Sequence, residues 1–162
     1  MIFLTIGSHE PFDRLVQAVD HWAATVKGVE VFGQITDRGV YRPNNFEWTA
    51  YLDADKYRKA CDRAEFLVAH AGMGSIITAM DLAKPIVIMP RRGHLHETRN
   101  DHQYATARQF RGKTGIFVAD DETELAAEID KARAATAEAR ERPKTPFAQE
   151  RLIIFLADYF RS

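Results

Sequence analysis

Small and polar residues follow two short apolar runs of the sequence, and they are of the types that bind phosphate groups. The run from Phe66 to Ala69 leads into His70-Ala71-Gly72-Met73-Gly74-Ser75, and the run from Ile2 to Ile6 leads into Gly7 and Ser8. Glycine lets a ligand come close to the backbone, and the free N–H groups at the start of a helix attract anions. The two segments therefore predict a site for a phosphate-bearing ligand.

The apolar runs are typical of parallel strands. Residues 66–69 and 85–90 flank one helical segment, and such a βαβ unit requires parallel strands with a right-handed crossover. Ligands of open α/β sheets bind at the carboxyl edge, where both loops would lie. The fold class is thus an α/β, Rossmann-like parallel sheet with helices on both faces. Further strands are predicted at residues 2–6, 29–35, 46–52 and 115–118. Helices are predicted with Pro11 in the first turn, after Asp53, at 98–110 and at 120–142.

Composition limits the class of protein. The chain has 162 residues, 46% of them hydrophobic, which suits one domain with its own core. Lysine and arginine number 22 against 23 acidic residues, so no overall charge favours nucleic acid. The single cysteine, Cys61, forms no internal disulfide and no thiolate metal set. No signal peptide or membrane span is recognised, so we expect a cytoplasmic protein.

Two segments allow a second interpretation. Asp53-Ala54-Asp55 resembles the D-x-D of metal-dependent glycosyltransferases, but we interpret Asp53 as the N-cap of the helix that follows. Trp48 and Tyr51 are more typical of a core than of a binding platform.

Residues 147–160 carry more apolar side chains than one core-facing stripe needs. This segment is expected to be a C-terminal helix that packs on the sheet or docks a partner.

The motifs resemble those of a known family. The family is the C-terminal, donor-binding domain of glycosyltransferase family 28, especially its stand-alone members: bacterial exopolysaccharide donor subunits and the cytosolic subunit of the eukaryotic dolichol-linked N-acetylglucosaminyltransferase. The resemblance covers nearly the whole chain. It rests on Thr5 to Leu15, His70 to Ile76, Lys84-Pro85, Pro90-Arg91-Arg92 with Glu97, and Asn100 to Gln103.

The resemblance implies that residues 1–162 form a single nucleotide-sugar-binding domain, one half of a GT-B enzyme. A separate membrane-anchored subunit would bind the polyprenol-linked saccharide acceptor and recruit this chain to the inner face of the membrane. Transfer from the UDP-sugar would be inverting and metal-independent, without a cofactor, in exopolysaccharide or lipid-linked oligosaccharide synthesis. The donor-binding residues it implies are Gly7, Ser8, His70, Gly72, Met73, Gly74, Ser75, Arg91, Arg92, Glu97, His102 and Gln103.

Some of these roles have alternatives. His9 is the candidate catalytic base, unless the partner supplies the base and His9 only contacts the donor. His70 is either a ligand contact or a structural histidine. Thr78 stands where larger family members often have an acidic residue that is read as a ribose contact, so ribose recognition is unassigned. Arg91 and Arg92 suit a carboxylate, which favours glucuronic acid as the sugar over N-acetylglucosamine or glucose.

Two other functions compete with this interpretation. The chain can be a non-catalytic scaffold that binds the UDP-sugar and adds nothing to turnover. Alternatively, a histidine-rich segment can hold a metal ion, because His-x-His places two imidazoles near one ion, and the chain would then be a metal-dependent hydrolase. The candidate ligands are His94, His96, Glu97, Asp101 and His102.

Overall fold

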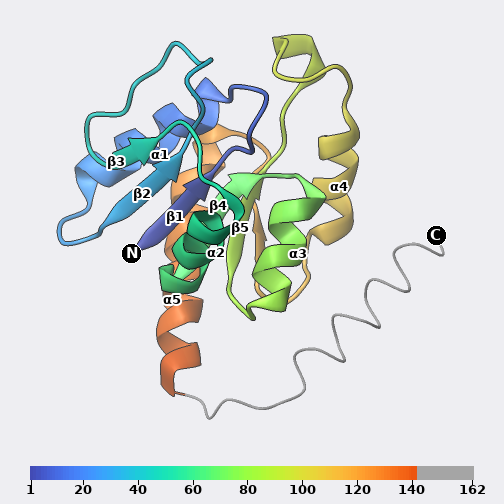
Figure 1. Cartoon of the computed structure of the whole chain (residues 1–162). Coiled ribbons are helices and arrows are strands. Elements are labelled where there is room, and N and C mark those ends of the chain that lie inside the picture. Colours follow the sequence, from blue (N-terminus) through green and yellow to red (C-terminus); the bar gives the residue numbers. More distant parts are fainter. Residues whose placement is uncertain (142–162) are drawn as a thin grey trace.

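The computed structural model describes residues 1–141 and contains one six-stranded, all-parallel sheet (Figure 1). The strand order is β3-β2-β1-β4-β5-β6. The carboxyl ends of the strands, and the loops that follow them, therefore meet along one edge. The prediction of a Rossmann-like parallel sheet is confirmed. The strands are β1 (Ile2–Thr5), β2 (Val31–Gln34), β3 (Glu47–Thr49), β4 (Phe66–His70), β5 (Ile86–Met89) and β6 (Ile116–Val118).

Helices cover both faces of this sheet (Figure 1). On one face, α1 and α5 pack on side chains such as Leu4 and Val68. On the other, α2, α3 and α4 pack on side chains such as Phe3 and Leu67. Successive strand residues point to opposite faces, so each strand serves both cores. The helices are α1 (Asp13–Thr25), α2 (Ala54–Arg63), α3 (Met73–Asp81), α4 (His102–Phe110) and α5 (Glu122–Glu141), with a 3₁₀ turn at Gly93–Leu95.

Several local predictions are confirmed or corrected. Asp53 is the N-cap of α2, since its Oδ1 accepts from the backbone N–H of Lys56 at 2.8 Å. Tyr51 is 66% exposed, so its prediction as a core residue is wrong, while Trp48 is partly buried. Cys61 is fully buried.

Two helices begin later than the sequence predicts. The helix α1 starts at Asp13 with Phe12 as its N-cap, so Pro11 precedes the first turn instead of joining it. The helix α4 starts at His102, four residues after the predicted Thr98. The connection between β5 and α4 begins with a 3₁₀ turn and a left-handed residue, His96 with φ 57°. Such a turn has no signal in hydrophobic periodicity, which explains the difference.

None of the described helices is both long and apolar enough to cross a membrane. The end of the predicted helix at Arg142 and the predicted helix at 147–160 lie outside the described residues.

Candidate functional site

The loop that follows β1 is the first part of the site. Gly7 has a φ of +82°, a conformation that glycine adopts without strain. Ser8 and His9 are exposed, and the Ser8 Oγ lies 2.8 Å from the His9 Nδ1, at hydrogen-bonding distance. Arg38 donates to the carbonyl of His9 at 3.1 Å. The loop thus presents a hydroxyl, an imidazole and a glycine backbone at the carboxyl edge of the sheet.

The loop after β4 brings the amino end of a helix to the same edge. Gly72 is the N-cap of α3, and no side chain caps this helix end. The positive end of the helix dipole is therefore available to an anion. A methyl group added to Gly74 would meet nothing within 4 Å, so space is open there. Gly72, Met73 and Gly74 thus lie at the amino end of α3, and their contact with a donor stays a prediction.

Other residues of this turn face inward. Ser75 is buried, and its hydroxyl hydrogen-bonds the phenol of Tyr57, whose pKa burial raises to about 12. Met73 is partly buried against the core under α3. Thr78 donates its hydroxyl to the carbonyl of Gly74 at 2.8 Å. The ligand-binding capacity of α3 therefore lies in its backbone N–H groups more than in its side chains.

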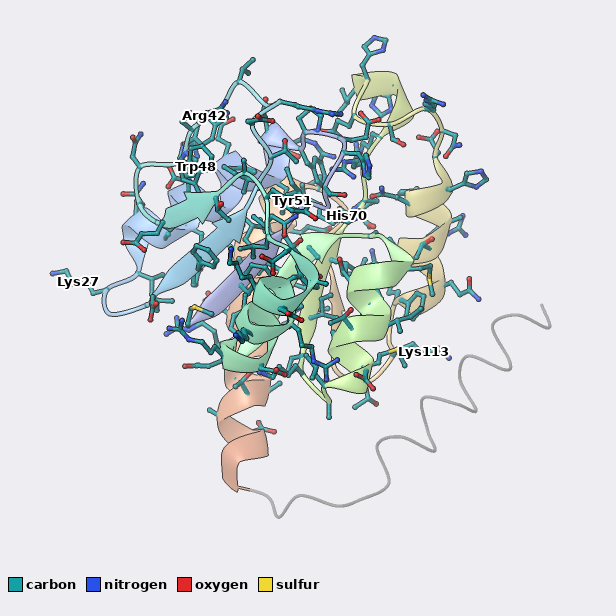
Figure 2. All side chains as sticks on the ribbon, viewed as in Figure 1. Lys27, Arg42, Trp48, Tyr51, His70 and Lys113 are labelled. Carbon is teal, nitrogen blue, oxygen red and sulfur yellow. The ribbon has the colours of Figure 1, made fainter. Side chains whose placement is uncertain are left out.

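His70 connects the two loops. Figure 2 shows it at the carboxyl end of β4, among the side chains of the sheet edge. A Cβ added to Gly7 would lie 3.2 Å from the His70 Cε1, and one added to Gly72 would overlap the ring. Burial, followed by the positive charge of Arg91, lowers the pKa of His70 to about 4, although a hydrogen bond to the backbone of Thr5 opposes this. The imidazole is therefore uncharged at neutral pH, and it packs between Gly7 and Gly72.

Arg91 turns toward the first loop. Its Nη2 donates to the carbonyls of Ile6, at 2.7 Å, and Glu10, at 2.6 Å. The residue is only 5% exposed, and burial lowers its pKa to about 10. Arg92 turns the other way, and its Nη2 donates to the carbonyl of Asp120 at 2.9 Å. Both guanidinium groups therefore bind backbone oxygens, although the Arg92 side chain is still 29% exposed.

The connection between β5 and α4 holds the remaining predicted residues. Glu97 forms a two-bond ion pair with Arg14, with both N–O distances at 2.8 Å, and it also accepts from the backbone N–H of Arg92. The side-chain oxygen of Gln103 accepts from the backbone N–H of Arg91 at 3.2 Å. His102 is exposed at the start of α4. Glu97 and Gln103 thus shape this loop, and His102 lies at its surface.

Sequence reasoning missed two residues, Arg14 and Gln34. Gln34 ends β2 beside β1, is 4% exposed, and donates to the carbonyl of Gly7 at 3.4 Å. Its Oε1 has no partner, and within residues 1–141 the same holds of two other buried side-chain atoms, the His70 Nδ1 and the Arg91 Nε. All three belong to residues that pack on or bond the loop after β1. The signal that the sequence offered for Gln34 was an amide residue within a predicted apolar strand.

The described residues contain no group of three or more potential ligands that could hold a metal ion. Glu97 is bound by Arg14, and the Asp101 carboxylate accepts from the backbone N–H of Gly93 at 2.8 Å. The histidine-rich segment is therefore not assembled as a metal centre.

A cavity of about 720 Å³ lies away from this site, between α2 and the strands β2 and β3. Its lining includes Phe32, Leu52, Lys59 and Arg63. None of the predicted site residues borders it, so it is separate from the loops described above.

Comparisons with known proteins agree with this architecture. The Glycosyltransferase family 28 C-terminal domain matches residues 1–153. The mouse protein named UDP-N-acetylglucosamine transferase subunit ALG13 is 25% identical over 77 residues, which are 48% of this chain and 6% of that protein.

Two solved structures have the same fold. The glycotransferase of kitacinnamycin has a TM-score of 0.63 and 21% identity, covering 95% of this chain and 37% of the other. The spinosyn forosaminyltransferase SpnP has a TM-score of 0.56 and 17% identity, covering 96% and 43%. The chain thus spans less than half of each glycosyltransferase that it resembles in structure.

Proposed function

The chain belongs to the glycosyltransferase family 28 C-terminal domain family, and from this premise we propose that it binds a UDP-sugar as the donor half of a GT-B glycosyltransferase. One observation carries the proposal. The His70 ring packs between the glycine loop after β1 and the uncapped amino end of α3, because a Cβ at Gly7 would lie 3.2 Å from its Cε1 and one at Gly72 would overlap it. Both segments offer backbone N–H groups to one diphosphate.

This arrangement suits a leaving diphosphate without a metal ion. A helix amino end carries about half a positive charge, and its N–H groups point at the bound anion. Gly7, Ser8, Gly72 and Gly74 are the contacts that we assign to the diphosphate. His102 and Gln103, at the start of α4, are assigned to the sugar side. Stabilising the leaving group in this way lowers the barrier to transfer.

The reaction that we propose is inverting transfer. An acceptor hydroxyl attacks the anomeric carbon and loses its proton to a base, while UDP leaves with the bonding electron pair. His9 is the candidate base in this chain, because it is exposed at the edge and an imidazole nitrogen can accept a proton. The alternative is that a partner subunit provides the base and that His9 contacts the donor.

The identity of the sugar depends on Arg92. Preference for glucuronate requires a free guanidinium, and that of Arg91 binds the carbonyls of Ile6 and Glu10. Of the two, Arg92, 29% exposed, keeps surface for a carboxylate, although its Nη2 also lies 3.8 Å from the Asp121 Oδ2. The name of the mouse relative favours N-acetylglucosamine instead. We therefore propose a UDP-hexose donor and leave glucuronate and N-acetylglucosamine to be ranked by titration.

We also propose that a second subunit completes the enzyme. The residues of this chain correspond to 37% and 43% of the two solved glycosyltransferases, which fits one part of a larger glycosyltransferase assembly. The mouse relative is itself named as a subunit. A membrane-anchored partner with a polyprenol-linked acceptor fits this division, and residues 147–160 are a candidate docking segment. The chain would then reach the membrane through its partner.

Calorimetric titration tests the donor proposal. We would titrate the chain with UDP, UDP-glucuronate, UDP-glucose and UDP-N-acetylglucosamine, with and without EDTA. We expect UDP to bind equally in both conditions, and Arg92→Ala to weaken UDP-glucuronate selectively if glucuronate is the donor. Binding that disappears with EDTA would contradict the metal-independent site. UDP binding together with unchanged transfer in His9→Ala and Gln103→Ala variants would favour the non-catalytic scaffold.

A further inference from the structure

The loops after β1 and β5 are joined by two arginines that reach in opposite directions. Arg91, just after β5, donates to the carbonyls of Ile6 and Glu10 in the loop after β1. Arg14, in the first turn of α1, donates to the carbonyl of Pro90 at 3.1 Å, just after β5. Each segment therefore supplies a guanidinium to the backbone of the other.

Both guanidinium groups also lie over one aromatic ring. The Cζ atoms of Arg14 and Arg91 are 5.4 Å and 5.1 Å from the centroid of the Phe12 ring. Phe12 is fully buried and is the N-cap of α1. Cations at this distance from an aromatic ring are attracted to its face. The Phe12 ring thus contacts the guanidinium groups of both arginines at the start of α1.

Arg14 extends the connection to the end of the β5–α4 loop. Its guanidinium pairs with both oxygens of Glu97, and its Nη1 pairs with Glu122 at 2.8 Å. Glu97 in turn accepts from the backbone N–H of Arg92. The side chains of Arg14 and Glu97 are only 14% and 12% exposed. A planar guanidinium that binds a carboxylate in this way is geometrically specific, and lysine does not reproduce it.

We propose that Arg14 and Arg91 form a reciprocal clasp, defined as these two side chains with Phe12 and Glu97, which positions the loops after β1 and β5 as one unit for the donor. This inference rests on the proposed donor site and adds positioning residues to it. Arg14 has no role in contacting the donor, because protein oxygens already bind all three of its nitrogens. Arg91 acts mainly through the loop whose carbonyls it holds.

Hydrogen exchange of the full chain without ligand tests the clasp directly. We expect Arg14→Lys to accelerate exchange of the Arg92 and Glu97 amides by about tenfold or more, because local opening of the loop becomes easier. The same variant should also accelerate exchange in residues 6–10, although Arg14 bonds none of their carbonyls. Arg91→Lys should accelerate both loops as well. Amides of the central strands β1 and β4 should keep their wild-type rates.

Matched variants separate the clasp from general loss of stability. Arg58→Lys changes an exposed arginine that pairs with Asp81 at 3.1 Å, far from the loops, and should leave both loops unchanged. Glu97→Gln weakens the same ion pair from the other side and should reproduce the Arg14→Lys pattern. If each arginine variant loosens only the segment that its own side chain bonds, the clasp is refuted. Uniform acceleration across the strands would also refute it.

The link to donor binding has its own measurement. Titration with UDP should give a dissociation constant raised about tenfold in Arg14→Lys, with Arg58→Lys unchanged. Wild-type affinity in Arg14→Lys, despite loosened loops, would overturn the positioning role. If the wild-type chain does not bind UDP, the donor proposal fails, while the exchange experiment still decides whether the two loops move as one unit.

Discussion

Gly72 and Gly74 lie two residues apart in one motif, but their surroundings differ. A Cβ at Gly72 would overlap the His70 ring, whereas one at Gly74 would meet nothing within 4 Å. We expect Gly72→Ala to lower the free energy of unfolding by about 1–3 kcal/mol, because the ring must shift. Gly74→Ala should raise it by up to about 1 kcal/mol, since alanine favours the helix. Urea unfolding measures the free energy of unfolding of both variants. Equal effects would contradict the close packing of the His70 ring on Gly72.

The depressed pKa of His70 makes stability depend on pH. Burial, then the charge of Arg91, lowers this pKa from 6.5 to about 4. The unfolded chain therefore binds the proton first as pH falls, so stability present above pH 6.5 is lost toward pH 4. The loss attributable to His70 is on the order of 3 kcal/mol.

Urea unfolding at a series of pH values tests this dependence. His70→Gln should flatten the stability profile between pH 6.5 and 4, because it removes the titrating group. His21→Gln, a change at an exposed histidine of α1, should keep the wild-type slope. A His70→Gln profile as steep as the wild type would show that other groups cause the loss.

Single residues mark the limit of sequence reasoning here. The sequence correctly placed Gly72 and Gly74 at the amino end of a helix, because glycine in a strand–helix turn has few alternatives. It assigned Arg91 to the sugar, whereas the structure directs its guanidinium to the carbonyls of Ile6 and Glu10. Side-chain direction depends on packing between distant segments, which hydrophobic periodicity does not encode. Arg14 was missed for the same reason.

At the scale of elements, the connection between β2 and β3 is bound by two carboxylates of α1, Asp13, which accepts from the backbone N–H of Val40, and Asp20. This connection has no helix, and Asp20 of α1, only 1% exposed, binds it. The carboxylate accepts from the Tyr41 hydroxyl and the Asn45 backbone, each at 2.8 Å, and from the Asn44 backbone. Asp20→Ala should lower the free energy of unfolding by about 2–3 kcal/mol, because several part-buried donors lose a charged acceptor.

A control in the same connection isolates this effect. Asp37→Ala changes an exposed carboxylate and should leave the midpoint of urea unfolding nearly unchanged. Similar loss of stability in both variants would mean that charge alone matters.

Apolar periodicity predicted the strands and most helices correctly. Gly39, Pro43 and the paired asparagines also indicated the helix-free connection between β2 and β3 correctly. The 3₁₀ turn before α4 was not predicted, because polar side chains and backbone caps determine it.

At the scale of the whole molecule, four large apolar side chains of residues 1–141 are exposed in segments that follow the carboxyl ends of strands. Leu95 and Tyr104, 46% and 42% exposed, belong to the β5–α4 connection and the first turn of α4. Val40 and Tyr51, 91% and 66% exposed, belong to the loops before and after β3. Exposed apolar groups around a binding site are typical of surfaces that another protein covers. This edge is therefore where we expect the acceptor-binding subunit.

Sedimentation with membranes from the source cells tests this surface. Wild-type chain should sediment with the membranes, and Leu95→Asp combined with Tyr104→Asp should reduce the bound fraction, because a charge opposes burial at an interface. The variant should still bind UDP with wild-type affinity if the donor site lies inside the edge. Ala24→Asp adds a charge to an exposed position in the last turns of α1, at the opposite edge, and should sediment normally. Wild-type sedimentation of the double variant would place the partner elsewhere, with residues 147–160 as the next segment to change, and equal loss in Ala24→Asp would mean that any added charge has this effect.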